Sequence, residues 1–256
     1  MNPAWLRAIR RYEFDCVRGD ISAPATVLEL GAGVGWQASW LRECGHDVVA
    51  VDVPEANHCE EPVFPITVYD GRTLPCPAQA FTVIFSSNVL EHVADLPTIA
   101  RELDRVLKPA GYAIHILPTS AWRWWTAIAH YLYLIKAPLA LLSAKLFATA
   151  TAPDIAEVAT RIHSRPIMAK LLRALLPVRH GEQGSAFTEL FSYTQRNWRR
   201  RFAALGWEVV ASRSTGIFYS GHAILGSLLG IPLRRRLSWL LGSSTRIYIV
   251  RRAGQG

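Results

Sequence analysis

A glycine-rich turn preceded by an acidic residue is the feature of this sequence that most directly suggests chemistry. The stretch VLELGAGVGW places Gly31, Gly33 and Gly35 after a short apolar run, and Glu29 stands two residues before the first of them. Glycine permits positive φ and lets a ligand approach the backbone with no Cβ in the way. The spacing is G-x-G-x-G, not the G-x-G-x-x-G of dinucleotide-binding turns. Because the Glu29 carboxylate would repel a pyrophosphate, the turn favours a cationic ligand.

The turn needs a parallel sheet to position it, and the rest of the sequence predicts one. Short apolar or β-branched runs alternate with helical patterns, which indicates βαβ units and a mostly parallel sheet. We therefore expect an α/β fold built on one seven-stranded sheet. The expected helices cover residues 4–18, 36–44, 94–107 and 192–205, and the expected strands cover residues 25–30, 47–52, 66–69, 82–87, 112–117, 207–212 and 245–251.

The regular alternation is interrupted after Pro118. Residues 119–185 are helical, apolar and basic in pattern, and the alternation returns only near Ala186. The two strands that follow complete the sheet and do not start a second one. We therefore predict one domain made of residues 1–118 and 186–256. Residues 119–185 form a helical insertion that serves as a lid or a membrane platform, and a smaller insertion lies near residues 220–242.

Charge is distributed unevenly between the two halves of the chain. Residues 1–118 hold 15 acidic and 9 basic side chains, a net charge of −6, whereas residues 119–256 hold 5 acidic and 19 basic ones, a net charge of +14. The basic half also holds the apolar stretches. This pairing is typical of proteins that bind an anionic surface through charge and apolar insertion together. Nucleic acid is the other partner class that such charge suits, and single arginine runs are also common on ordinary solvated helices.

Four further motifs follow the glycine turn in order. VVAVD ends in Asp52, and VYDG contains Asp70 and Gly71; SSNVLEHV then ends the fourth expected strand, and RVLKPAG precedes the fifth. With the glycine turn, these motifs resemble those of the class I S-adenosylmethionine-dependent methyltransferases, in particular the type 11-like group. The resemblance covers residues 26–118 closely and residues 186–252 in outline. It implies a doubly wound, Rossmann-like fold whose last strand is antiparallel.

The resemblance also implies S-adenosylmethionine as the cofactor and suggests roles for the motif residues. Asp52 corresponds to the family acid that binds the ribose hydroxyls, and Asp70 corresponds to the acid that flanks the adenine. Asn88 begins the N-x-L-E-H turn, which lines the cofactor. The full set of predicted cofactor-binding residues is Glu29, Gly31, Gly33, Gly35, Asp52, Asp70, Gly71 and Asn88.

Methyl transfer requires an acceptor atom that is held in line with the methyl group and shielded from water. An acceptor that carries a proton also needs a base, and histidine titrates near neutral pH. His92, His180 and His222 are the candidates, and we predict His92 and His180 as catalytic residues. For His92 the alternative is a structural role in the turn that lines the cofactor pocket.

Glu182, Tyr193 and Tyr219 are the predicted acceptor contacts. Glu182 and His180 lie at the exit of the insertion, where members of the resembled family build the acceptor pocket. The two tyrosines follow in the part of the chain that returns to the sheet. The alternative for this neighbourhood is a polar loop that only closes an apolar insertion.

The N-x-L-E-H turn also raises the question of a metal. Glu91 and His92 both carry metal-ligand side chains, while the four cysteines of the chain form no C-x-x-C pair. Relatives that hold a metal at this turn carry a further glutamate, and Asn88 stands in its place here. We therefore expect no metal, and we expect free thiols in a reducing compartment.

The apolar segment AWRWWTAIAHYLYLIKAPLALLSAKLF, residues 121–147, has three interpretations. Its longest uncharged run, residues 124–135, has 12 residues, whereas a spanning helix needs about 20. Its polar side chains fall within one narrow wedge, so we expect an amphipathic helix that ends or kinks at Pro138. Two similar pieces, residues 165–180 and 223–242, and several tryptophans favour docking on a membrane surface. A buried lid or dimer contact is the second interpretation, and a true span is the third.

We therefore expect a methyltransferase that acts on a small or amphiphilic acceptor, such as a lipid or lipid-linked sugar, at the cytoplasmic face of a membrane. The opening MNPAWLRAIRRYEFD lacks the apolar core of a secretory signal, which favours a cytoplasmic protein with peripheral membrane contact. The alternative is a non-catalytic module that keeps the fold and serves as a membrane or protein scaffold. Methylation of nucleic acid is not expected, because SSNVLEH stands where Asn/Asp-Pro-Pro-Tyr/Phe would be needed.

Overall fold

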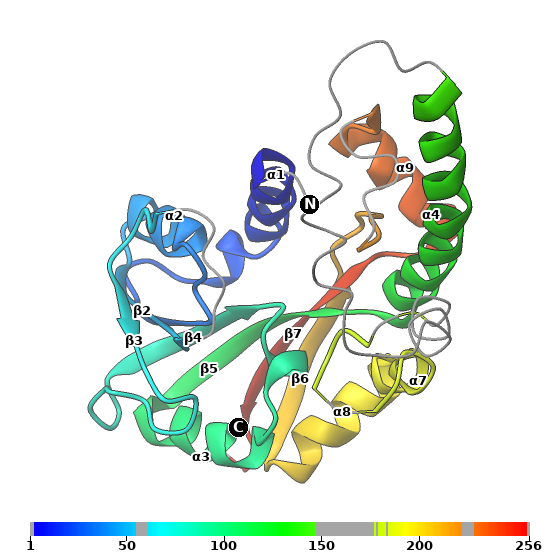
Figure 1. Cartoon of the computed structure of the whole chain (residues 1–256). Helices are drawn as coiled ribbons and strands as arrows, with labels where there is room; N and C mark the ends of the chain where they lie inside the picture. The colour runs from blue at the N-terminus through cyan, green and yellow to red at the C-terminus, as the bar shows by residue number, and fades with distance from the viewer. Residues whose placement is uncertain are drawn as a thin grey trace.

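The computed structural model describes residues 3–54, 61–146, 177, 179–182, 184–221 and 228–254. Seven strands form one sheet in the order β3-β2-β1-β4-β5-β7-β6 (Figure 1). The first five are parallel, and β7 is antiparallel to both β5 and β6. The doubly wound, mostly parallel fold predicted from the sequence is confirmed. The strands are β1 (Thr26–Leu30), β2 (Asp47–Asp52), β3 (Ile66–Val68), β4 (Phe81–Ser87), β5 (Leu107–Pro118), β6 (Trp207–Ser214) and β7 (Thr245–Arg252).

Strand β1 carries the glycine turn and lies near the centre of the sheet. It pairs with β2 on one side and β4 on the other, so that Glu29 lies between Ala50 and Phe85. Four of its five residues are buried, as expected for a parallel strand covered on both faces. Because the three strands run in the same direction, their carboxyl ends meet at one edge. The turns that carry the predicted cofactor residues all leave the sheet at that edge.

Helices cover both faces of the sheet (Figure 1). On one face, Trp40 of α2 packs with Phe85 in a core that also includes the end of α1. On the other face, Leu103 of α3 and Trp198 of α8 pack with Ile84. The helices are α1 (Pro3–Asp15), α2 (Trp36–Glu43), α3 (Leu96–Val106), α4 (Ser120–Leu146), α7 (Thr188–Ser192), α8 (Gln195–Ala204) and α9 (Ile231–Leu241), and the 3-10 turns are η1 (Arg18–Asp20) and η2 (Leu90–His92).

Two expected elements have other boundaries in the structure, and the local sequence explains both differences. The helix expected over residues 192–205 is two helices, because Thr194 has an extended backbone and caps α8 by accepting a hydrogen bond from the Asn197 N–H. The strand expected over residues 112–117 begins earlier, at Leu107, which pairs with Phe81 of β4. The turn sequence LKPAG therefore belongs to the strand, with a register shift in the pairing.

Helix α4 begins directly after β5 and lies beside α9 at one end of the sheet (Figure 1). The Trp125 indole N–H donates to the Leu241 carbonyl at 2.8 Å, which ties the two helices together. Among the described residues, no helix is both long and apolar enough to cross a membrane. Most of the piece at residues 165–180, and His222, lie outside the described residues. The boundaries predicted for the insertion, residues 119–185, stay a prediction.

A buried glutamate of α7 connects the chain on both sides of the insertion. Glu189 forms an ion pair with Arg123 of α4, with 2.8 Å between Oε2 and Nε. The Arg123 Nε–H itself donates to the Ala186 carbonyl, so the contact with Glu189 is electrostatic in character. The other carboxylate oxygen accepts the backbone N–H groups of His180 and Gly181, at 2.7 Å each. One buried side chain therefore holds α4, α7 and residues 180–182 together.

We expect Glu189→Ala to lower the free energy of unfolding by about 3–5 kcal/mol, because it leaves the Arg123 charge and two backbone N–H groups buried without their partner. Urea unfolding followed by circular dichroism measures the change. Glu208→Ala, on an exposed position of β6, is the control and should change stability by less than about 0.5 kcal/mol. A loss below about 1 kcal/mol for Glu189→Ala would show that the carboxylate does not hold these elements.

Candidate active site

The glycine turn lies against the turn that follows β4. A Cβ added to Gly31 would approach Cγ2 of Val89 to 2.4 Å, so a side chain at this position would push the two turns apart. Gly33 has a φ of 59°, and a Cβ added to it would meet no described atom within 4 Å. Gly31 is therefore required by packing, whereas Gly33 leaves an open concave backbone surface that a ligand can occupy.

Asp52, at the end of β2, fixes this turn. Its Oδ2 accepts the Gly33 N–H at 2.7 Å, and its Oδ1 accepts the Val53 N–H at 2.8 Å. A carboxylate has about four acceptor positions, so these two hydrogen bonds leave capacity for hydroxyl donors of a ligand. The side chain is almost buried yet lies at the edge where β1 and β2 end. This placement suits recognition of a ribose.

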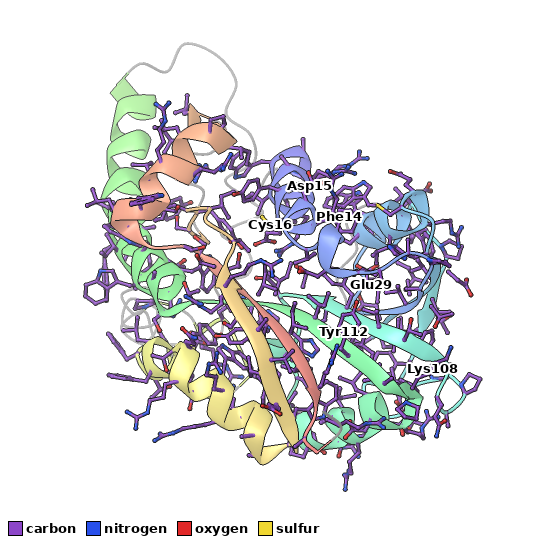
Figure 2. The ribbon with its side chains drawn as sticks, turned by 180° about the vertical axis from the view of Figure 1, so that it is seen from behind. Phe14, Asp15, Cys16, Glu29, Lys108 and Tyr112 are labelled. Carbon is purple, nitrogen blue, oxygen red and sulfur yellow. The ribbon has the colours of Figure 1, made fainter. Side chains whose placement is uncertain are left out.

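Glu29 is a buried acid on β1, one residue before the strand ends (Figure 2). Burial raises its pKa to about 8. The hydrogen bond that Glu29 accepts from the Ala38 backbone lowers the pKa, and the nearby Asp52 charge raises it by a smaller amount. Oε2 of Glu29 has no hydrogen-bond partner among the described residues. A buried acceptor without a partner is costly, so Glu29 is arranged to receive a donor or a cation from outside the chain.

The remaining predicted cofactor residues lie at the same edge of the sheet. The Asp70 carboxylate accepts the N–H groups of Thr73 and Arg72, and these two bonds lower its pKa. Gly71 follows with φ of 74°. Asn88 has φ of 56°, and its N–H donates to the Ile116 carbonyl of β5. The chain therefore turns sharply at the ends of β3 and β4, which keeps both loops at the strand ends.

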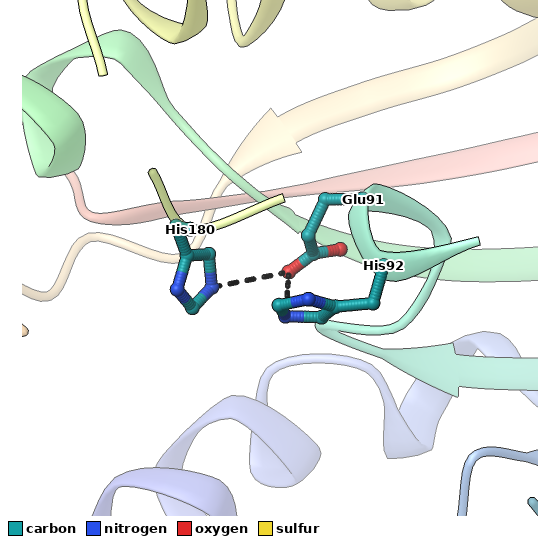
Figure 3. Close-up of side chains that lie close together, drawn as sticks. All are labelled: Glu91, His92 and His180. Atoms are coloured by element: carbon teal, nitrogen blue, oxygen red, sulfur yellow. Dashed lines mark ion pairs between the residues drawn. The ribbon is translucent and has the colours of Figure 1, made fainter. Parts of the chain in front are cut away.

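A second group of side chains lies beyond Asn88. This cluster consists of Glu91 and His92 on the turn η2 and of His180. Nε2 of His92 and Nε2 of His180 each lie 3.9 Å from Oε1 of Glu91 (Figure 3). The two imidazole rings stand nearly perpendicular, with centroids 4.5 Å apart. His180 also packs on the Trp122 ring at 4.5 Å. Residues nearly 90 positions apart in the sequence thus meet at one point.

Burial controls the protonation of this group. It raises the pKa of Glu91 to about 8 and lowers the pKa of His180 to about 4. The pKa of His92 is also lowered, again chiefly by burial. At neutral pH the two imidazoles are therefore uncharged and have nitrogen lone pairs available.

A model of the family described as a methyltransferase domain matches residues 4–212 of the chain. The chain belongs to the class I S-adenosylmethionine-dependent methyltransferases. The family and the cofactor predicted from the sequence are thereby confirmed.

Curated relatives match less than half of the methyltransferase. A malonyl-[acyl-carrier protein] O-methyltransferase from Halorhodospira halophila is 35% identical over 99 residues, which cover 34% of this chain and 33% of that protein. A glycine/sarcosine/dimethylglycine N-methyltransferase from Actinopolyspora halophila is 32% identical over 113 residues, which cover 40% and 20%. The match therefore covers a third or less of the length of these two relatives.

Solved structures match the methyltransferase over nearly its whole length. An S-adenosylmethionine-dependent methyltransferase from Mesorhizobium loti aligns with a TM-score of 0.52 at 16% identity, over 94% of this chain and 98% of that one. A SAM-dependent methyltransferase from Methanosarcina mazei aligns with a TM-score of 0.50 at 13% identity, over 92% and 96%. At such identities the similarity shows the fold and no more.

The residues present fit S-adenosylmethionine. The open backbone at Gly33 can receive the nucleoside, the spare acceptor positions of Asp52 suit its hydroxyl groups, and the unpartnered oxygen of Glu29 suits a cationic group. All three lie at the carboxyl ends of the adjacent strands β1 and β2, Glu29 and Asp52 on the strands and Gly33 on the turn after β1. The individual roles of these residues stay predictions.

The predicted acceptor contacts have different environments. Tyr193 is buried near the cluster, and its hydroxyl donates to Glu189. Glu182 is half exposed, and its N–H donates to the Glu91 carbonyl, so it lies next to the cluster. Tyr219 is buried elsewhere, where its hydroxyl donates to Glu13 of α1 at 3.0 Å. The structure thus brings Tyr193 and Glu182 to His92 and places Tyr219 in a buried polar network.

Four residues that shape this region were not identified from the sequence. They contribute a buried ion pair, an aromatic wall and a position where a side chain would not fit, and none belongs to a recognisable motif. They are Arg123, Glu189, Trp122 and Gly181. Only the fold brings them together, because α4 and α7 lie far apart in the chain.

We expect the affinity for S-adenosylmethionine to rise roughly 20- to 30-fold between pH 6 and 7.5, because a cation binds the ionised form of Glu29 and its pKa is raised to about 8. This range lies below the titration of the ligand amino group, at about 8. Calorimetry in buffers of different ionisation enthalpy measures the proton released. In the free protein the sign is opposite: the raised pKa means that stability falls as pH rises from 4.5 towards 8.

Glu29→Gln should remove the pH dependence of binding and the proton release. Glu43→Gln, an exposed position on α2, should leave both intact. Affinity that is constant over this pH range in the wild-type chain would show that Glu29 does not receive the cationic group.

Proposed function

We propose that this protein transfers a methyl group from S-adenosylmethionine to a small or amphiphilic acceptor bound at Glu91, His92 and His180. The observation that carries the proposal is the position of this cluster. Val89, two residues before Glu91, packs on Gly31 of the cofactor turn. The acceptor cluster and the cofactor turn are therefore neighbours at the same edge of the sheet.

The chain contributes binding, orientation and exclusion of water. When bound, S-adenosylmethionine supplies an electrophilic methyl group on a sulfonium. Glu29 and Asp52 hold the cofactor, and His92 and His180 contact the acceptor group as the catalytic residues. Their uncharged imidazoles accept a hydrogen bond or a proton from an acceptor O–H or N–H. Trp122 and Tyr193 form an apolar wall behind His180 that limits access of water.

An amphiphilic acceptor fits the surface on the insertion side. Trp239 is 95% exposed and Leu240 84% exposed on α9, next to the exposed arginines Arg235 and Arg236. Exposed aromatic and apolar side chains continue on α4, which α9 contacts. Apolar groups and arginines on one surface favour contact with an anionic membrane. The relatives named for malonyl-[acyl-carrier protein] and for glycine support a small acceptor group.

We expect the chain to bind S-adenosylmethionine in calorimetry and to transfer labelled methyl to a component of membrane lipid or polar extracts. Asp52→Ala should weaken binding roughly 10- to 100-fold, since hydrogen bonds to a charged group contribute about 1.5–3 kcal/mol. Asp47→Ala, at the opposite end of β2, should bind normally. Absence of cofactor binding in the wild-type chain, or equal binding by both variants, would contradict the proposed activity.

Membrane contact is tested by flotation with vesicles that contain phosphatidylglycerol, at low salt. The chain should float with the vesicles, and Arg235→Gln combined with Arg236→Gln should lower the partition coefficient about tenfold or more, given about 1 kcal/mol for each arginine near an anionic surface. Arg199→Gln with Arg200→Gln removes the same charge from α8 and should have a smaller effect. A wild-type chain that stays with the soluble fraction would exclude membrane contact and favour a lid that packs on its own domain.

A further inference from the structure

Three side chains with metal-ligand atoms converge at the acceptor side of the site. They are Glu91, His92 and His180, and one ligand atom from each lies within 4.8 Å of the other two. Both imidazole Nε2 atoms lie 3.9 Å from the same carboxylate oxygen (Figure 3). The sequence indicated no metal because Asn88 stands where relatives that hold a metal at this turn carry a further glutamate. The structure supplies His180 as a third ligand.

The buried carboxylate of Glu91 has no hydrogen-bond partner among the described residues. Its side chain is 0% exposed, and neither oxygen accepts a hydrogen bond from another described residue. A buried carboxyl group in a native protein is normally paired, hydrogen-bonded or bound to a metal. Figure 3 shows the carboxyl group directed between the two imidazole rings. The charge of Arg10 acts on Glu91 without a direct ion pair, so an ion held among the three side chains would be a direct partner of the carboxylate.

The third ligand is held in place by the backbone of its own segment. The His180 N–H and the Gly181 N–H both donate to Glu189, and the Glu182 N–H donates to the Glu91 carbonyl. A Cβ on Gly181 would approach that carbonyl oxygen to 2.6 Å, so glycine is needed for this close approach. The segment is thus fixed to η2 by its backbone, and His180 does not depend on a bound ligand for its position.

We propose that Glu91, His92 and His180 bind one divalent transition-metal ion, such as Zn²⁺, and leave a coordination position open for a hydroxyl group of the acceptor. Two imidazole nitrogens and one carboxylate oxygen are a donor set that such ions take in sites with an open position. Metal–ligand distances of about 2.0–2.2 Å place ligand atoms roughly 3–3.5 Å apart. The two separations of 3.9 Å therefore need to close by less than about 1 Å, and the largest separation, within 4.8 Å, by less than about 2 Å, which side-chain rotation can supply.

The open side of the site faces away from Glu91. The side chains of His92 and His180 are 41% and 35% exposed, whereas Glu91 is fully buried. A bound ion would therefore be reached by an acceptor from the imidazole side, next to the cofactor turn. With an ion bound, the imidazole nitrogens serve as its ligands, and the ion takes over their role of activating the acceptor hydroxyl. The assignment of a hydroxyl acceptor rests on the proposed methyl transfer, whereas the metal site itself does not.

A hydroxyl oxygen bound to the ion loses its proton more readily, as water does on Zn²⁺. The O–H proton leaves to water, and the oxygen keeps the electron pair. That pair forms the new bond to the methyl carbon while the pair of the broken C–S bond stays on sulfur. The ion keeps its charge throughout, so no oxidant or reductant is needed.

Metal binding is tested on the full chain after treatment with EDTA and desalting. Zn²⁺ titrated in a calorimeter should bind with one equivalent per chain, and Co²⁺ should give visible absorption bands of a site with nitrogen and oxygen ligands. His92→Ala, His180→Ala and Glu91→Gln should each weaken Zn²⁺ binding at least about a hundredfold, since loss of outer contacts alone costs roughly 10- to 100-fold. His180→Asn serves as a second variant of similar shape.

Two control variants keep the local surroundings. His130→Ala removes a histidine of α4, and Glu43→Gln removes an exposed carboxylate of α2; both should bind Zn²⁺ as the wild-type chain does. Far-UV circular dichroism and S-adenosylmethionine binding by the EDTA-treated variants check that the fold is kept. Azide added to the Co²⁺-loaded chain should shift the visible bands, because an open position accepts an anion.

The results separate the two proposals. A wild-type chain that binds S-adenosylmethionine but neither Zn²⁺ nor Co²⁺ overturns the metal site and leaves the proposed function standing. Zn²⁺ binding that persists at full affinity in the three ligand variants also overturns it. A chain that binds Zn²⁺ through these residues but does not bind S-adenosylmethionine supports the site and contradicts the proposed function. Co²⁺ bands that azide does not change overturn the open coordination position.

Discussion

The buried carboxylate of Glu189 is the interaction on which the acceptor side of this protein depends. It neutralises Arg123 inside the fold and accepts two backbone N–H groups from residues 180 and 181. An isolated buried arginine would be strongly destabilising, so the pair must form or the region must rearrange. Because the acceptors of those N–H groups are fixed to α7, the chain that leaves the insertion is held against η2. His180 reaches Glu91 only through this arrangement.

The cofactor side is built on a different principle. Its residues lie on the turns that follow neighbouring strands, and parallel strands bring those turns to one edge without any special contact. Gly33 and Asp52 are 19 residues apart in the chain, yet they are hydrogen-bonded because β1 and β2 are adjacent and in register. Local sequence and sheet order are enough to make this half, whereas the acceptor half needs long-range side-chain contacts.

This difference explains what the sequence could and could not reveal. Seven strands and most helices were predictable because alternation and capping are local properties, and the β2 bounds agree residue for residue. The glycine turn and Asp52 were recognisable because their spacing is fixed by a βαβ unit. Glu189 and Gly181 gave no signal, since a glutamate in FTELFS has no local pattern that marks it as buried. The acceptor role of Tyr219 stays a prediction, and its hydrogen bond to Glu13 of α1 could not be inferred from spacing.

Two buried carboxyl groups, Glu29 and Glu91, lie on the two sides of the Gly31–Val89 contact. Glu29 stands one residue before the end of β1, and Glu91 lies on the turn after β4. Each has at least one oxygen without a partner among the described residues, so each lowers the stability of the chain on its own. Within the described part of the chain, neighbouring elements supply donors to both oxygens of Asp52, but to only one oxygen of Glu29 and to neither oxygen of Glu91. Sites that keep such unsatisfied groups usually do so for function. In the proposals made above, a cationic group of the cofactor pairs with Glu29 and a bound ion pairs with Glu91, and the packing of Val89 on Gly31 keeps these two positions next to each other.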